Sequence, residues 1–323
     1  MPHLVRTLFY FAVTDYESSL VDYHFSVFCY IRFKISEISL KKQFSRPTGL
    51  HKGSEYGNFA HHYTLFPRSM RNPDRETTFR FKRFSVENRR SAMKVGTDGV
   101  LLGAWSDIPG DLTGECENGN TPNSAPRILD IGAGTGLVSL MLAQRFPTAS
   151  VTAIEIDSDS AKECAVNFRQ SPWAGRLETV HDDFLAARLP AAYNLIVSNP
   201  PFFNNGAKAP DSARHIARHE DSLPLDRLIA QASDLLESKL GSLALVLPVE
   251  RCDEAVLAAE ISRLYLWRKV MVTTVPGKAP RRVLLQFLNR ETDANISAEY
   301  LSDSSGNRSE WHRTLVKDFY LKP

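Results

Sequence analysis

The sequence predicts an α/β fold: a mostly parallel sheet with an antiparallel final strand and helices on both faces. From residue 127 onward, short apolar runs alternate with helical patterns, which is typical of strands and crossover helices. A glycine-rich turn follows the first run. The last two runs are joined by Pro276–Arg282, which is too short for a crossover helix, so we expect them to pair antiparallel. The expected strands are Arg127–Ile131, Val151–Ile156, Leu177–Val180, Asn194–Ser198, Ser242–Leu247, Val270–Val275 and Val283–Leu288.

Composition excludes several classes of protein. The chain has 323 residues, of which 43% are hydrophobic and 24% charged, so it can bury a substantial core. The net charge of +2 is too small to indicate a polyanionic partner by itself. The four cysteines are scattered without a C-x-x-C pair, so we expect no metal site, no disulfide framework and a reducing cytoplasm. The apolar runs near the start are shorter than the roughly 18 residues of a membrane span, so no membrane attachment is expected.

The chain divides into two segments. Residues 1–75 mix aromatic and charged side chains without periodicity, so we expect an N-terminal extension that is poorly ordered or whose start is assigned too far upstream. A basic arm that grips RNA is the alternative. Residues 76–323 are predicted to form one domain. An alternating stretch, Phe79–Val86, an apolar run, Val100–Trp105, and a polar loop, Pro109–Pro126, precede its sheet.

The glycine turn points to a nucleotide-like ligand. A buried strand ends in the run D-I-G-A-G-T-G at Asp130–Gly136, and Leu137–Arg145 continues as a helix former, which brings backbone N–H groups close to a ligand. A dinucleotide fingerprint would have Gly or Ala where Leu137 stands, which disfavours nicotinamide and flavin. The run resembles the first motif of class I S-adenosylmethionine-dependent methyltransferases, which have a Rossmann-like sheet. The resemblance implies S-adenosyl-L-methionine as cofactor, in contact with Asp130, Gly132, Gly134 and Gly136.

Carboxylates follow the next two strands. Glu155 and Asp157 stand at the end of the second strand, where a carboxylate can accept two hydrogen bonds from ribose hydroxyls, and we favour Glu155. The third strand runs into Asp182 and Asp183. By the same resemblance Asp183 is expected to face the adenine amino group, whereas Asp182 is interpreted as a turn cap. Ligands bind at the carboxyl ends of open α/β sheets, so these positions support one site.

The most specific motif is N-P-P-F at Asn199–Phe202, directly after the fourth strand. Two prolines fix φ near about −65° and remove two donors, so the loop is rigid and its carbonyls can accept hydrogen bonds. The Asn199 side-chain oxygen and the Pro200 carbonyl are predicted to accept both N–H bonds of a ring amine and turn its lone pair toward a methyl group. Phe202 would supply an aromatic face for the target base. Asn199 is also expected to touch the cofactor.

Flanking segments narrow the substrate. An N-P-P-F loop after a class I glycine turn occurs in enzymes that methylate adenine, guanine or glutamine. Four segments, Phe81–Phe84, Met93–Trp105, Ala217–Glu220 and Lys317–Leu321, are similar to the tRNA1(Val) (adenine(37)-N6)-methyltransferase family. The resemblance covers about Phe79–Pro323. It implies a bacterial cytoplasmic enzyme that methylates N6 of adenine 37 in the anticodon loop of valine tRNA, with Asp98 at the entrance of the cofactor pocket.

Two alternatives stay open at this stage. An N-P-P-F enzyme could act on a guanine of ribosomal RNA or a glutamine side chain of a protein, and a methyltransferase-like fold could bind RNA without catalysis. Nothing in the sequence indicates an obligate protein partner. Basic residues cluster in Arg68–Lys94, with nine Lys or Arg against three acids, and in Arg268–Arg282, with five and no acid. Both runs are predicted to contact phosphates.

Overall fold

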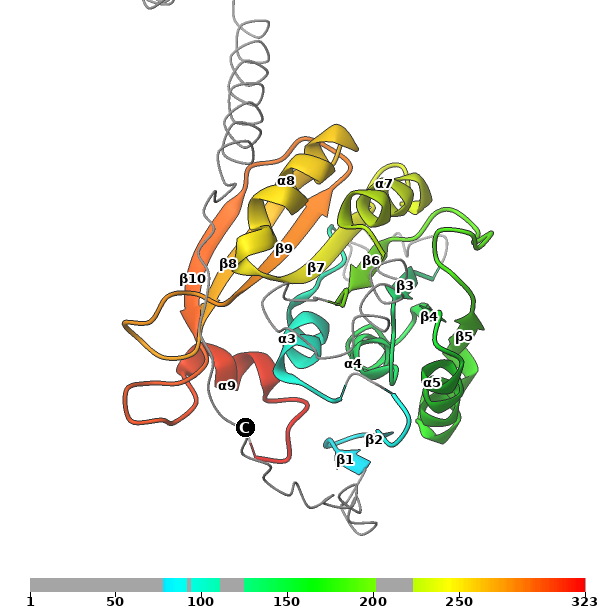
Figure 1. Ribbon diagram of the computed structural model, residues 1–323. Coiled ribbons are helices and arrows are strands. Elements are labelled where there is room, and N and C mark those ends of the chain that lie inside the picture. Colours follow the sequence, from blue (N-terminus) through cyan, green and yellow to red (C-terminus); the bar gives the residue numbers. More distant parts are fainter. Residues whose placement is uncertain (1–77, 92–93, 111–124, 202–222, 323) are drawn as a thin grey trace, which may run out of the picture. The chain divides into compact units, whose positions relative to one another are not determined.

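The computed structural model describes residues 78–91, 94–110, 125–201 and 223–322. The predictions for residues 1–75, Phe202 and Ala217–Glu220 therefore lie outside the described residues. An eight-stranded sheet, in the order β10-β8-β9-β7-β6-β3-β4-β5, forms the centre of the fold (Figure 1). Its strands are β3 (Arg127–Ile131), β4 (Ser150–Glu155), β5 (Leu177–His181), β6 (Leu195–Ser198), β7 (Ser242–Pro248), β8 (Tyr265–Thr273), β9 (Arg282–Leu288) and β10 (Asn295–Tyr300).

Only β9 runs against the other strands of this sheet. It pairs antiparallel with both β7 and β8, whereas every other neighbouring pair is parallel. The predicted antiparallel pairing of the last two runs is confirmed. The expected strands end at Leu288, but the structure has one more, β10, which pairs parallel with β8 at the edge of the sheet. An edge strand is held by backbone bonds on one side and keeps exposed polar side chains, so it lacks the apolar run that identifies a central strand.

Helices cover both faces, as predicted. Alternate residues of each strand face opposite sides, so Leu129 and Ile131 of β3 pack with α7 and α8, whereas Ile128 packs with α3 and α4. Among the helices of the described residues, none is long and apolar enough to cross a membrane. The helices are α3 (Thr97–Trp105), α4 (Leu137–Arg145), α5 (Ser158–Gln170), α7 (Leu225–Leu235), α8 (Cys252–Ile261) and α9 (Glu310–Val316), with short 3-10 turns at Ala174–Arg176 and Val249–Arg251.

A two-stranded hairpin precedes the sheet and packs on the end of the chain. The backbone N–H of Lys82 donates to the Phe319 carbonyl at 2.8 Å, and the Phe81 ring stacks on Tyr320 with 5.9 Å between ring centroids. Phe81–Phe84 and Lys317–Leu321, two of the segments that are similar to the family, are therefore in contact although they lie near opposite ends of the described residues. Both belong to one apolar cluster with α3, α4 and α5. The hairpin strands are β1 (Thr78–Arg80) and β2 (Ser85–Glu87).

Phe319→Ala is expected to destabilise the fold. Phe319 is only 2% exposed in the cluster that joins the hairpin to the helices, and truncating a buried Phe costs about 3–5 kcal/mol. The midpoint of urea unfolding should fall accordingly. Leu321→Ala, two residues away at a side chain that is 60% exposed, is the matched control and should change little. Equal midpoints for the two variants would contradict the packing of this tail.

Candidate active site

A cavity of about 890 Å³ opens at the carboxyl ends of β3, β4, β5 and β6. This volume lies within the range of small-molecule sites. The glycine turn, the strand ends and the first turns of α3 and α7 form its walls. The cavity brings together residues that the sequence placed at separate strand ends: Asp98, Asp130, Gly132, Gly134, Glu155, Asp183 and Asn199.

Backbone conformation favours glycine at all three glycine positions of the turn, and the space around each position differs. Gly132, Gly134 and Gly136 all adopt positive φ, at 69°, 57° and 79°. A Cβ at Gly132 would meet no atom within 4 Å, so the backbone there faces open space in the cavity wall. A Cβ at Gly136 would lie 2.6 Å from the Phe168 ring. Gly136 thus lets α5 pack against the turn and lies outside the cavity lining, and its predicted cofactor contact stays a prediction.

Asp130 is a buried carboxylate in the cavity wall. Its exposure is 2%, and its Oδ2 accepts hydrogen bonds from the Ser139 backbone N–H at 3.1 Å and the Ser139 hydroxyl at 2.7 Å. Burial raises the pKa of Asp130 from 3.8 to about 6, and the bonds from Ser139 partly oppose this rise. Buried acids with raised pKa values that line a cavity are typical of functional sites.

Glu155 ends β4 beside the glycine turn. Its Oε2 accepts from the Gly134 N–H at 2.8 Å, and its Oε1 accepts from the Asp157 N–H at 2.9 Å. Each carboxylate oxygen has a second lone pair, so Glu155 can still accept bonds from ligand hydroxyls. Asp157 instead caps α5 by accepting from the Ser160 N–H at 2.8 Å, a bond that lowers the pKa of Asp157.

The turn after β5 corrects one prediction. The cap expected of Asp182 is made by Asp183, whose Oδ1 accepts from the Leu185 N–H at 2.9 Å, two residues along the chain. This is the bond that an aspartate makes when it closes a turn on itself. Asp182 accepts from the Asp183 N–H at 2.8 Å. Both carboxylates line the cavity, and the contact of Asp183 with adenine stays a prediction.

Asp98 lines the cavity from the first turn of α3. Its Oδ2 accepts from Arg282 Nε of β9 at 2.8 Å, which ties the start of the helix to the sheet. The triplet Thr97–Gly99 forms the first residues of α3. Arg282 was predicted to contact phosphate as part of a basic run, and in the structure it pairs with Asp98.

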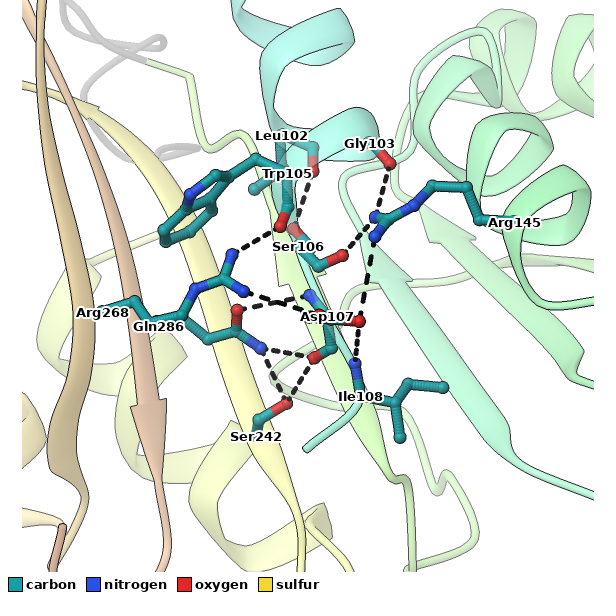
Figure 2. A network of polar contacts seen from close by, with 10 residues as sticks. All are labelled: Leu102, Gly103, Trp105, Ser106, Asp107, Ile108, Arg145, Ser242, Arg268 and Gln286. Atoms are coloured by element: carbon teal, nitrogen blue, oxygen red, sulfur yellow. Dashed lines mark hydrogen bonds and ion pairs between the residues drawn. The ribbon is translucent and has the colours of Figure 1, made fainter. Parts of the chain in front are cut away.

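A polar network fixes the other end of α3, at the amino edge of the sheet (Figure 2). Arg145 donates to the carbonyls of Gly103 and Ser106, and Arg268 Nη2 donates to the Trp105 carbonyl at 2.6 Å. Asp107 lies between the two guanidinium groups, 3.8 Å from Arg145 and 3.6 Å from Arg268. Arg268 and Arg282, both in the second basic run, Arg268–Arg282, therefore form ion pairs within the protein.

The N-P-P-F loop leaves β6 next to the glycine turn. Ser198, the last residue of β6, donates its hydroxyl to the Ile131 carbonyl at 2.9 Å and so joins the two strand ends. Asn199 and Pro201 line the cavity. Pro200, the residue between them, is buried. The strand, the turn and the loop therefore bring Asn199 to the same cavity as the carboxylates.

Sequence reasoning missed three parts of the lining. Ser91 and Lys94 reach the cavity from the segment that precedes α3, and Arg227 reaches it from the first turn of α7. Lys94 lies in the segment Met93–Trp105, which resembles the family, and ends the basic run Arg68–Lys94, but neither signal indicated the cavity wall. Nothing local marked Ser91 or Arg227.

Comparison with known proteins identifies the family of the chain. The sequence model of the methyltransferase small domain matches residues 119–269. The tRNA1(Val) (adenine(37)-N6)-methyltransferase of Bacteroides thetaiotaomicron is 42% identical over 245 residues, 75% of this chain and 97% of that protein. The chain belongs to this methyltransferase family. Members from Porphyromonas gingivalis and Tolumonas auensis are 42% and 38% identical and cover 75% and 76% of the chain, and it covers 94% and 97% of them.

A solved structure supports the fold. The crystal structure of a predicted O-methyltransferase from Agrobacterium tumefaciens matches with a TM-score of 0.51 and 20% identity, covering 69% of this chain and 96% of that one. At this identity the likeness concerns the fold alone. The predicted class I methyltransferase sheet and the predicted family are both confirmed.

Proposed function

We propose that this methyltransferase transfers a methyl group from S-adenosyl-L-methionine to N6 of adenine 37 in the anticodon loop of valine tRNA, in the cytoplasm. The family relatives carry this activity in their names. The observation that carries the proposal is that Asn199 opens onto the same cavity as Gly132, Gly134 and Glu155. A group that can bind a target amine thus shares one cavity with groups suited to a nucleoside cofactor.

The cavity fits the proposed cofactor. Its volume of about 890 Å³ is sufficient for a nucleoside with an amino-acid tail, and the wall at Gly132 offers space that a side chain would fill. Glu155 would accept bonds from ribose hydroxyls, and Asp130 would place negative charge near a cationic ligand. When bound, the cofactor supplies a methyl group on a sulfonium sulfur.

The N-P-P-F loop would perform the remaining chemistry by orientation. The lone pair of an adenine amino group is delocalised into the ring, so the amine is a weak nucleophile. The Asn199 side-chain oxygen and the Pro200 carbonyl would accept its two N–H bonds, which turns the lone pair out of conjugation and stabilises the positive charge that develops on nitrogen. No strong base is needed at the start, because the nitrogen becomes cationic and acidic as the N–CH₃ bond forms and the S–CH₃ bond breaks, and it then releases one proton to water. Phe202 would stack on the base.

The test measures transfer of labelled methyl groups to several acceptors. Unmodified valine tRNA should be labelled, and the same tRNA with guanine at position 37 should not. A base in a tRNA loop is already unpaired, whereas adenine in a DNA duplex must first leave its pair, so a duplex should be a poor substrate. Labelling of a ribosomal RNA fragment or of a glutamine peptide in preference to tRNA would overturn the substrate.

Salt dependence tests how the tRNA is held. Arg90 and Lys94 are exposed beside the cavity, and we expect them to contact phosphates. Binding of tRNA should weaken steeply with added salt, and the R90Q/K94Q double variant should show a shallower slope. The choice of adenine over guanine should persist, because it depends on the base pocket. An unchanged slope would place the phosphate contacts elsewhere.

Asp130→Asn is expected to stabilise the ligand-free protein at neutral pH. Because the pKa of Asp130 is 3.8 in the unfolded chain and about 6 in the fold, the folded state binds its proton more tightly. The free energy of unfolding therefore falls as the pH rises through this window and stays lowered above it. Asparagine can accept the same bonds from Ser139 without this penalty. At about pH 7.5 the variant should gain up to about 3 kcal/mol in urea unfolding.

The same variant is expected to bind S-adenosyl-L-methionine more weakly, because it lacks the negative charge that would face a cationic ligand. Calorimetry should show that wild-type affinity rises as the pH rises through about 6, whereas the affinity of the variant stays flat. If the variant binds as tightly as wild type at neutral pH, the charge of Asp130 does not contribute to cofactor affinity.

A further inference from the structure

Helix α5 carries two buried polar side chains one turn apart that have no role in the chemistry above. Glu163 is 4% exposed and Asn167 is fully buried. Both face the segment Glu87–Ser91, which we call the strap and which links the hairpin to the cavity wall. Burying a carboxylate costs free energy unless hydrogen bonds compensate it, so the partners of Glu163 matter.

Glu163 binds the backbone of the strap at three successive residues. Its Oε1 accepts from the N–H groups of Arg89 and Arg90 at 2.6 and 2.9 Å, and its Oε2 accepts from the N–H of Ser91 at 2.9 Å. Hydrogen bonds to a charged acceptor are stronger than neutral ones. The three N–H groups turn inward while the side chains of Arg89 and Arg90 remain exposed.

Asn167 joins the strap to the glycine turn. Its Oδ1 accepts from the Glu87 N–H at 2.8 Å, and its Nδ2 donates to the Glu87 carbonyl at 3.0 Å and to the Thr135 carbonyl at 2.8 Å. Thr135 lies between Gly134 and Gly136. A single side chain therefore sets the position of the strap relative to the turn.

The strap ends in the cavity. Ser91 is part of the lining, and a Cβ placed on Gly134 would lie 3.5 Å from the Ser91 hydroxyl. We propose that Glu163 and Asn167 are positioning residues, which hold the strap as a wall of the cofactor cavity and thereby set cofactor affinity. The proposal rests on the proposed function for the identity of the ligand. The exposed arginines of the strap would be fixed beside the cavity by the same three bonds.

Glu163→Gln tests the proposal. The amide –NH₂ group cannot accept a hydrogen bond, so at least one of the three backbone N–H groups loses its partner. Amide hydrogen exchange should rise at least tenfold at Arg89, Arg90 and Ser91 while β3 keeps its protection. By calorimetry without RNA, the Kd of S-adenosyl-L-methionine should rise at least tenfold. With tRNA, the KM of the cofactor should rise by a similar factor, and kcat at saturating cofactor should change less than twofold.

Two further variants make the result specific. Asp159→Asn removes an exposed carboxylate one turn earlier on α5, which pairs only loosely with Lys162 at 3.7 Å, and it should leave exchange and affinity unchanged. Glu163→Asp keeps the charge on a shorter side chain and should give the same effects at smaller size. It also serves if the glutamine variant fails to fold.

The outcomes separate the two proposals. Unaltered exchange at the strap in both Glu163 variants would overturn the role of the carboxylate. Raised exchange with unchanged cofactor affinity would overturn the strap as a cavity wall. If wild-type protein binds the cofactor but labels no tRNA, the proposed substrate fails while the binding and exchange results still decide the role of Glu163.

Discussion

Asn199→Ala is expected to lower kcat by roughly 10²- to 10³-fold, the effect of removing one preorganised group that stabilises charge in a transition state. The Kd of S-adenosyl-L-methionine should change only a few-fold. The reason is that the bonds proposed for the Asn199 side chain go to the target amine and are needed mainly as its lone pair turns toward the methyl group. Ser198 and the buried Pro200 should keep the loop in place, because they do not depend on that side chain.

Single-turnover kinetics on valine tRNA, with cofactor affinity measured separately, provide the readout. Asn295→Ala, at an exposed position on the edge strand β10, is the control and should behave as wild type. If Asn199→Ala retains near-normal turnover, the proposed orientation of the amine is wrong. If it loses cofactor affinity and turnover together, the side chain acts mainly on the cofactor.

Gly134→Val is expected to weaken cofactor binding by roughly 100-fold or more, equivalent to about 3 kcal/mol. Two effects combine. The backbone at Gly134 has φ of 57°, a conformation that a β-branched residue rarely adopts. A side chain there would also enter the cavity lining, where its Cβ would already lie 3.5 Å from the Ser91 hydroxyl.

Gly306→Val separates these two effects. Gly306 also has positive φ, at 85°, and a Cβ there would meet no atom within 4 Å, but it lies between β10 and α9 and not in the cavity lining. We expect both variants to lose stability from backbone strain, measured by thermal unfolding. Only Gly134→Val should lose affinity in calorimetry. Equal affinities would show that the turn at Gly134 leaves room for a side chain.

The sequence predicts the part of the site that depends on local pattern. The turn at Asp130–Gly136, the carboxylate Glu155 and the loop at Asn199 each follow a strand directly, and parallel strands end at one edge, so their meeting could be inferred from order along the chain. The fold was predictable for the same reason, because buried strands are continuous apolar runs.

The rest depends on contacts between distant segments. Glu163 looks like any charged residue on an amphipathic helix, and only the fold shows that it binds the strap 72 to 74 residues earlier. The basic run containing Arg268 was predicted to bind phosphates because no acid lies near it in the sequence. Its partner in the fold, Asp107, is 161 positions away. Asp183 was assigned to the ligand and Asp182 to the turn, a distinction that adjacent identical residues do not reveal in sequence.

The reversed direction of β9 puts its start at the same edge of the sheet as the cavity. The cofactor cavity uses the ends of β3 to β6, whereas β8 ends and β9 begins further along that edge, joined by a connection that carries the exposed Lys278 and Arg281. Insertions or charge changes in this connection would leave the strands that form the cavity untouched. The exposed cations of this connection can therefore change while the backbone of the cavity stays fixed.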